Sequence, residues 1–119
     1  MQGSSHKASS ASDVASEQPF LTENDIAMEK MMADMHSEPT GNVDVDFVRM
    51  MVPHHQGAID MAVLELRYGT SPRLKALAQE IVVTQQQEIA AMKLAIGEPA
   101  PPSYAAPTAS SEAHNSSPQ

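Results

Sequence analysis

Apolar residues recur with helical spacing along the central part of the chain, and two short clusters of turn-forming residues interrupt them. The clusters read "SEPTGN" at 37–42 and "YGTSP" at 68–72. Apolar positions three or four residues apart form one side of a helix, whereas Gly, Pro, Ser and Asn favour turns. The pattern therefore predicts three helices, and connections this short predict that neighbouring helices run antiparallel.

Residues that favour caps or turns bound each predicted helix. Ser, Thr and Asp side chains accept hydrogen bonds from the first helical N–H groups, Pro fits the first turn, and Gly ends a helix. The predicted boundaries, from N-cap to stop, are Thr22 to about His36, Asp44 to about Tyr68 with Gly69 as the stop, and Ser71, followed by Pro72, to Gly97.

The two ends of the chain differ in composition from the helical part. Residues 1–20 are mostly Ser, Ala and polar, and residues 98–119 are rich in Pro, Ala and Ser. Such segments bury too little apolar surface to offset the entropy of ordering. We therefore expect two disordered tails around one all-α domain, an antiparallel bundle of three helices over residues 21–97.

The third predicted helix carries an apolar stripe with two polar interruptions. Gln85 and Glu88 fall on the apolar side of this helix, and polar groups on a buried face need hydrogen-bond partners. The apolar members of the stripe are Leu74, Leu77, Ala78, Ile81, Val82, Ile89, Met92 and Ile96.

Composition and motifs exclude several function classes. The chain has 119 residues and no cysteine, which excludes zinc fingers, iron–sulfur clusters and thiol chemistry. A net charge of −8 without a basic run or Trp argues against nucleic-acid binding. No apolar stretch approaches the roughly 18 residues of a membrane span. The chain also lacks a phosphate-binding Gly loop and a nucleophile motif, so we expect no enzyme activity.

Methionines dominate one side of the first predicted helix. At 100° per residue, Met28, Met31, Met32 and Met35 share one face. Such a face either fills irregular space in a core or presents thioether ligands.

Two adjacent histidines follow a methionine pair in the second predicted helix. Met50 and Met51 stand four residues before His54 and His55, and Pro53 between them frees the carbonyl of the preceding turn. Pairing through the two turns predicts that Met28 lies level with residue 53, and Met31 and Met32 level with residues 49–50. The turn at 68–72 places Gln85 near His55, so His55 is either a buried, hydrogen-bonded side chain or a ligand that Gln85 orients. In the second case Glu88, one turn further on, has a similar or direct role.

Thioethers and imidazoles without a thiolate suit Cu(I), tolerate Cu(II) through histidine, and also suit silver. Zinc would leave the methionine excess unexplained, and a di-iron site needs a Glu-x-x-His spacing that is absent. His6 and His114 lie in the tails as weak extra candidates. The residues predicted to bind copper are Met28, Met31, Met32, Met35, His36, Met50, Met51, His54, His55, Met61 and Met92.

The stretch "FVRMMVPHHQGAIDMA", followed by a helix such as "LKALAQEIVVTQQQEIAAMK", resembles the domain-of-unknown-function three-hundred-and-five family. The most specific element is the pattern Met-x-x-His-His-Gln-x-Ala that begins at Met51. The resemblance covers about residues 21–97 and implies a ferritin-like helical bundle, export to the periplasm or cell surface, and copper binding or resistance of the CopM-like kind. The resemblance implies the family's copper-binding character for Met51, His54 and His55, and more loosely for Met61 and the Met28–Met35 cluster.

The chain departs from the family pattern in two ways, and a second function stays open. Three helices suggest that a homodimer completes a four-helix bundle, and the absence of a signal peptide suggests a trimmed chain. A copper-donor or copper-acceptor protein is a further expected partner. The alternative is a helical protein-interaction module with a Met-rich apolar face and no metal role.

Overall fold

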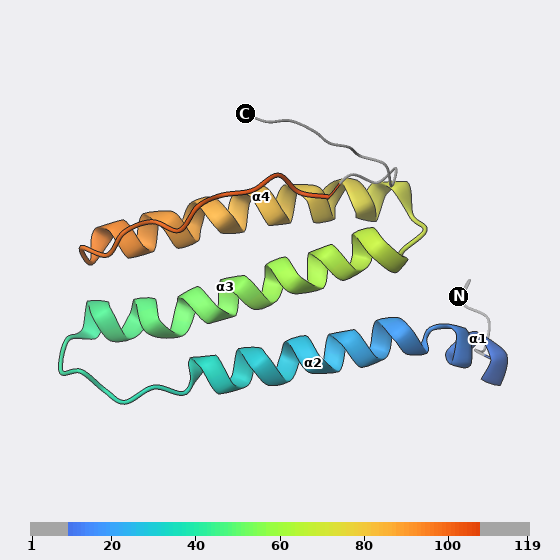
Figure 1. Ribbon diagram of the computed structural model, residues 1–119, viewed down its shortest axis with the longest axis horizontal. Helices are drawn as coiled ribbons and strands as arrows, with labels where there is room; N and C mark the ends of the chain where they lie inside the picture. The colour runs from blue at the N-terminus through green and yellow to red at the C-terminus, as the bar shows by residue number, and fades with distance from the viewer. Residues whose placement is uncertain (1–9, 108–119) are drawn as a thin grey trace, which may run out of the picture.

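The computed structural model describes residues 10–107, and these form helices joined by short connections (Figure 1). No strand occurs in this part of the chain, so the all-α prediction is confirmed. The helices are α1 (Ala11–Ser16), α2 (Gln18–Met35), α3 (Val43–Tyr68) and α4 (Pro72–Ala95).

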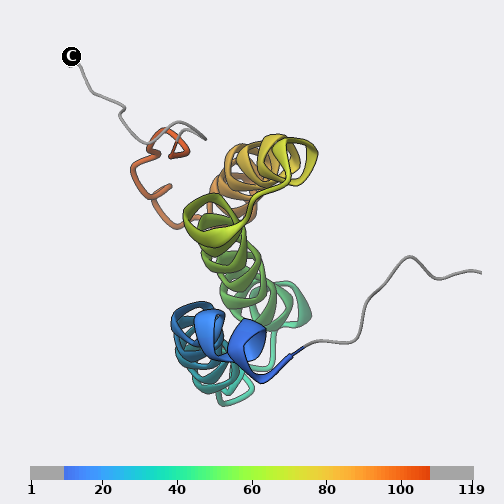
Figure 2. The same ribbon diagram turned by 90° about the vertical axis from the view of Figure 1, so that its right-hand side faces the viewer.

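The three long helices lie side by side with α3 in the middle (Figures 1 and 2). α2 and α4 each pack against α3 and not against one another, while the short α1 contacts α2. Consecutive long helices run antiparallel, as expected for the predicted helical bundle (Figure 1). The middle helix therefore has to bury two opposite sides.

Two of the predicted helix starts are wrong. α2 begins at Gln18 with a proline in its first turn, so Thr22 lies inside the helix instead of capping it. The N-cap of α3 is Asn42 and not Asp44, because the Asn42 side chain accepts a hydrogen bond from the Val45 N–H at 3.1 Å. In both cases a residue earlier in the chain favours the helix start: a proline in the first turn of α2, and the Asn42 cap of α3.

The predicted boundaries of the last helix are confirmed. Ser71 caps α4 by accepting a hydrogen bond from the Leu74 N–H at 3.2 Å, and Pro72 is the first helical residue. Gly97 follows the end of the helix with a φ of 82°, a left-handed conformation that glycine adopts without steric cost. Its neighbour Glu98 donates its N–H back to the Lys93 carbonyl at 2.9 Å.

Parts of both expected tails have defined structure. Residues 11–16 form α1, which a reciprocal capping pair between Ser10 and Asp13 begins. Residues 98–107, called the strap below, run back along α4 (Figure 1). The Gln86 side chain bonds both the N–H and the carbonyl of Tyr104 at 2.9 Å, which ties the strap to α4. Composition missed this because amide hydrogen bonds from α4, together with packing of Ala106 against the core, hold the strap. His6 and His114 lie outside the described residues.

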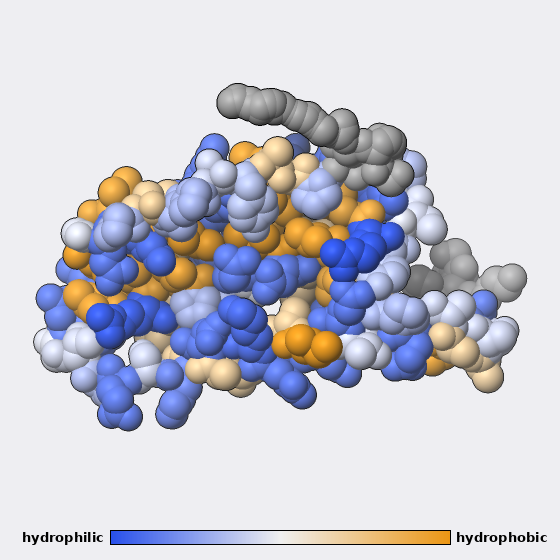
Figure 3. Space-filling model, in the orientation of Figure 1, coloured by the Kyte–Doolittle hydropathy of each residue, from blue (hydrophilic) through white to orange (hydrophobic). Residues whose placement is uncertain are grey.

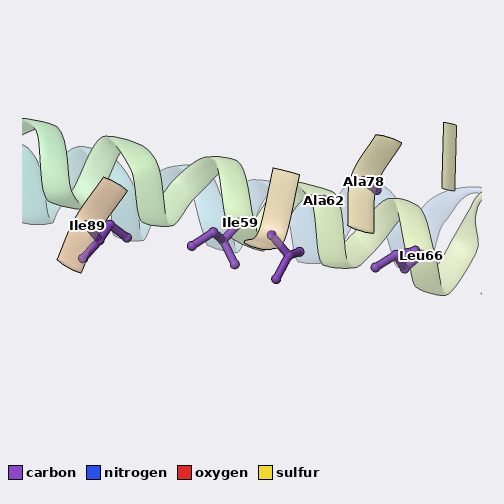
Figure 4. Close-up of a cluster of buried hydrophobic side chains, with 6 residues drawn as sticks. Ile59, Ala62, Leu66, Ala78 and Ile89 are labelled. Atoms are coloured by element: carbon purple, nitrogen blue, oxygen red, sulfur yellow. The ribbon is translucent and has the colours of Figure 1, made fainter. Parts of the chain in front are cut away.

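The hydrophobic core lies between α3 and α4 (Figure 4). Two of its side chains, Ile59 and Val82, are almost completely buried. The buried cluster consists of Ile59, Ala62 and Leu66 from α3 and Ala78, Val82 and Ile89 from α4. Only part of the apolar stripe predicted for α4 is therefore buried. Leu74, Leu77 and Ile81 remain 53%, 52% and 39% exposed.

The contact between α2 and α3 is of a different kind. No residue of α2 is fully buried. The Glu23 carboxylate accepts hydrogen bonds from Arg67 and Tyr68, and the rings of Phe20 and Tyr68 meet edge to face with centroids 6.2 Å apart. These contacts fasten the start of α2 to the end of α3. Within the described residues, no helix is long and apolar enough to cross a membrane.

Candidate metal centre

The adjacent histidines of α3 serve two different interfaces. The His55 side chain is 12% exposed and faces α4, whereas His54, one residue earlier, is exposed. This follows from the 100° rotation per residue in a helix whose two opposite sides pack against different neighbours. The two rings still lie 6.2 Å apart, centroid to centroid.

Both ring nitrogens of His55 have partners. Nδ1 lies 2.9 Å from the Met51 carbonyl oxygen, and Nε2 lies 2.6 Å from Glu88 Oε1. A carbonyl only accepts, so Nδ1 carries a proton. A carboxylate also only accepts, so either Nε2 carries a second proton or the Glu88 carboxyl group donates one. A metal ion reaching Nε2 must therefore displace Glu88.

The predicted level of Gln85 opposite His55 is wrong by about one helical turn. The bonded residue is Glu88, one turn further on, for which a similar or direct role was predicted. The connection between the helices is extended, with ψ of 163° at Gly69 and 117° at Ser71, instead of closing symmetrically. An extended connection offsets two antiparallel helices along their axes.

The pairing of His55 with Glu88 fixes the register of α3 against α4, and this register brings two further predicted ligands to the same level. Met51 stands one turn before His55, and Met92 stands one turn after Glu88. Because the helices are antiparallel, both methionines come to the same level of the α3/α4 contact. Both are partly buried. The first candidate group is thus Met51, His55 and Met92, with Glu88 on the imidazole.

A second group follows from a close approach between α2 and α3. A Cβ atom added to Gly57 would lie 2.5 Å from Met31 Sδ, so the Met31 thioether rests where other residues carry a side chain. The same antiparallel register places Met28 level with Met61, and Met35 level with His54. The result is a ladder of sulfur and imidazole groups along one contact.

The predicted register of this contact is wrong by about two turns. Met31 was expected beside residues 49–50, yet it lies over Gly57. Residues 36–42 run on beyond the end of α2 before α3 begins, as Figure 1 shows. The first turns of α3 therefore extend past α2, and Met50 comes level with the end of α2, where His36 is the exposed C-cap.

The ladder is partly open to solvent. Met31 and Met35 are half-buried, while Met28, Met50 and Met61 are 37%, 46% and 45% exposed. Met32 was predicted to share this face, but it is 63% exposed and lies at the outer edge of the methionine side of α2.

Carboxylates and imidazoles alone do not build a site here. Among residues 10–107, no three His, Asp or Glu side chains come together. Thioether plus imidazole is a donor set for a soft ion.

One residue has a larger role than the sequence pattern assigned to it, whereas Glu88 takes the direct role at His55 that was one of its predicted alternatives. Gly57 provides the space for Met31. A lone glycine inside a helical pattern indicates close approach of another group, and this signal could have located the contact.

Comparison with known proteins places the chain in a family. The family described as Domain of unknown function (DUF305) matches residues 1–96, and the chain belongs to that family. It is also similar to a protein of Acanthamoeba polyphaga mimivirus described as "Uncharacterized protein L153", with 36% identity over 55 residues. The match covers 46% of this chain and 36% of the viral protein.

Proposed function

We propose that this member of the DUF305 family binds Cu(I) through methionine and histidine side chains, for copper sequestration, trafficking or resistance in the periplasm. The observation that carries the proposal is the ladder between α2 and α3, with Met31 seated over Gly57. One turn to either side, the register places Met28 by Met61 and Met35 by His54.

The chemistry of the donors favours Cu(I). Thioethers are soft, neutral ligands that need no deprotonation, and imidazole adds a borderline nitrogen. The same groups would accept silver, and the histidines would tolerate Cu(II). When bound, the ion supplies no reaction in this proposal; the protein holds it, as in a CopM-like copper-binding protein, and is not an enzyme.

His54 is favoured over His55 as the first nitrogen ligand, because the ring nitrogens of His55 already have hydrogen-bond partners. The His55 imidazole is engaged by Met51 and Glu88, so copper there competes with an existing contact. His54 is exposed, and its ring has no such competitor among the described residues. The exposed methionines beside it let a copper donor or acceptor protein reach the ion, which supports trafficking over permanent storage.

An anaerobic Cu(I) competition titration with a chromogenic chelator tests the proposal. The variant Met31→Leu/Met35→Leu/His54→Gln should lose at least ten-fold in affinity, because each change removes a donor atom while keeping nearly the same volume. The matched variant Met51→Leu/His55→Gln/Met92→Leu should lose less. Circular dichroism checks that both variants keep their helices.

Two single changes sharpen the assignment. Met32→Leu removes an exposed thioether at the edge of the ladder and should change the affinity least. Glu88→Gln should leave the affinity unchanged if His54 is the ligand and raise it if His55 is. Failure of the intact chain to compete with the chelator would overturn the copper proposal.

A further inference from the structure

One side of the three-helix layer carries apolar residues that nothing in residues 10–107 covers. Seen along the layer, the strap lies on one side of α3 and α4, and the opposite side is open (Figure 2). The hydrogen bonds from Gln79 and Gln86 to the strap mark the covered side of α4.

Each long helix contributes a stripe to the side opposite the strap, here called the open face. On α3, Phe47, Met50, His54 and Met61 follow helical spacing between the side that meets α2 and the side that meets α4. The stripes consist of Met28 and Met32 on α2, Phe47, Met50, His54 and Met61 on α3, and Leu74, Leu77 and Ile81 on α4; all are exposed.

The contact between His55 and Glu88 marks this side of α4. Glu88 is seven residues beyond Ile81, which is two helical turns, so both lie on the same side of the helix. Gln86 lies on the other side of α4 and bonds the strap. The exposed Leu77 and Ile81 are therefore opposite the strap, next to the exposed side of α3.

The two sides of the layer differ in the charges that they carry. Asp25 and Glu29 belong to the same exposed side of α2 as Met28 and Met32, and Glu65 continues the α3 stripe one turn beyond Met61. The strap side carries charges of both signs instead. Two hollows there have volumes of about 490 and 370 Å³. Their charged lining residues are Lys30, Arg49, Arg67 and Lys93 together with Glu23, Asp34, Asp60 and Glu98.

The strap side is visibly mixed in character. Apolar residues gather between α3 and α4, and hydrophilic residues dominate along α2 (Figure 3). The open face combines methionine, leucine and isoleucine with carboxylates at its borders. An apolar, methionine-rich surface with acidic borders complements a helix that is apolar on one side and basic on the other.

We propose that the open face docks a basic amphipathic helix of a partner protein, which lies over the exposed side of α3 between α2 and α4. Leu, Ile or Phe side chains of the partner would pack on Leu77, Ile81 and the methionines, and its Lys or Arg would face Asp25 and Glu29. A second copy is disfavoured because two such faces would oppose carboxylates. The inference goes beyond copper binding and does not depend on it.

A synthetic 18-residue peptide of Leu and Lys with helical spacing is the probe, labelled for fluorescence anisotropy. The intact chain, kept metal-free with a chelator, should bind it with micromolar affinity. Two control peptides should bind at least ten-fold more weakly: the Leu and Glu counterpart, because of charge repulsion, and a scrambled Leu and Lys peptide, because its apolar side is lost.

Variants of the protein locate the binding surface. Leu77→Gln/Ile81→Gln should weaken peptide binding at least ten-fold while Cu(I) affinity stays unchanged, because neither residue is a proposed ligand. Leu94→Gln, at a leucine that is 62% exposed away from the stripe, is the matched control and should have no effect. Asp25→Asn/Glu29→Gln should weaken binding and reduce its salt dependence, whereas Glu38→Gln/Glu80→Gln should not.

Three outcomes would overturn the inference. These are absence of peptide binding up to about 100 µM, equal binding of the acidic peptide, and insensitivity to Leu77→Gln/Ile81→Gln. Concentration-dependent dimerisation in sedimentation that Leu77→Gln/Ile81→Gln abolishes would assign the face to a second copy instead. Since every peptide measurement is made without metal, its failure is distinct from failure of copper binding.

Discussion

The two sides of α3 pack by different means. Against α4, aliphatic side chains such as Ile59 and Val82 are 1% and 0% exposed. Against α2, α3 buries Leu64, but the contact also relies on a thioether over Gly57 and on ion pairing at Glu23, and α2 itself buries no residue completely. One side of the middle helix thus resembles an ordinary core, and the other resembles an adaptable surface.

The two contacts differ in how far their side chains can rearrange. Branched aliphatic residues have restricted rotamers and specify one packing, whereas methionine is flexible and tolerates rearrangement. Under the proposed function, the α2/α3 interface has to admit and release an ion, which needs adjustable side chains. The α3/α4 contact would then hold the fold while the α2/α3 contact changes.

The largest expected effect on stability comes from a mutation in the aliphatic contact between α3 and α4. Ile59→Ala should lower the free energy of unfolding by about 2–5 kcal/mol, because it leaves a cavity among fully buried neighbours. Met31→Ala, on the other side of α3, should cost about 1 kcal/mol, because Met31 is only half-buried. Urea unfolding followed by circular dichroism measures both. Equal costs would contradict the comparison.

A smaller effect sharpens the description of the α2/α3 contact. Gly57→Ala gains helix propensity of about 1 kcal/mol, but the new methyl group collides with Met31 at an overpacking cost of about 1–3 kcal/mol. We expect net destabilisation of up to about 2 kcal/mol. In the Met31→Ala background the same change should instead stabilise. A double-mutant cycle by urea unfolding measures the coupling, and additive effects would show that Met31 does not rest on Gly57.

The smallest effect concerns the end of the α2/α3 contact. The hydrogen bond to Glu23 raises the pKa of Tyr68 above its usual value of 10.0. The folded protein therefore holds the phenolic proton more tightly than the unfolded chain does. This stabilisation is fully present below pH 10 and is lost as the pH rises through the folded pKa.

Tyr68→Phe removes that titration. We expect the variant to show a shallower fall of Tm with pH above about pH 10 than the unchanged protein, because its phenolic group is gone. Thermal unfolding at a series of alkaline pH values, followed by circular dichroism, compares the two. Superimposable profiles would mean that the contact of Tyr68 with Glu23 contributes nothing.

Much of the fold could be predicted, and less of the candidate site. Helical periodicity and the Ser71 cap predicted α4 well, because these signals are local in sequence. The strap escaped because its order depends on amide hydrogen bonds from Gln86, a residue distant from Tyr104 in sequence. For the site, the residue types were informative, but the predicted register was wrong for Met31 and for Gln85 opposite His55.

The sequence by itself determined the three long helical segments and which side chains are available as soft ligands, since helix formation and side-chain chemistry depend mainly on residues close together along the chain. Tertiary structure decided which of them meet. The extended connections at 36–42 and 69–71 set the offsets between helices. Those offsets join Met31 to Gly57 and His55 to Glu88, because in antiparallel helices the offset alone decides which side chains share a level.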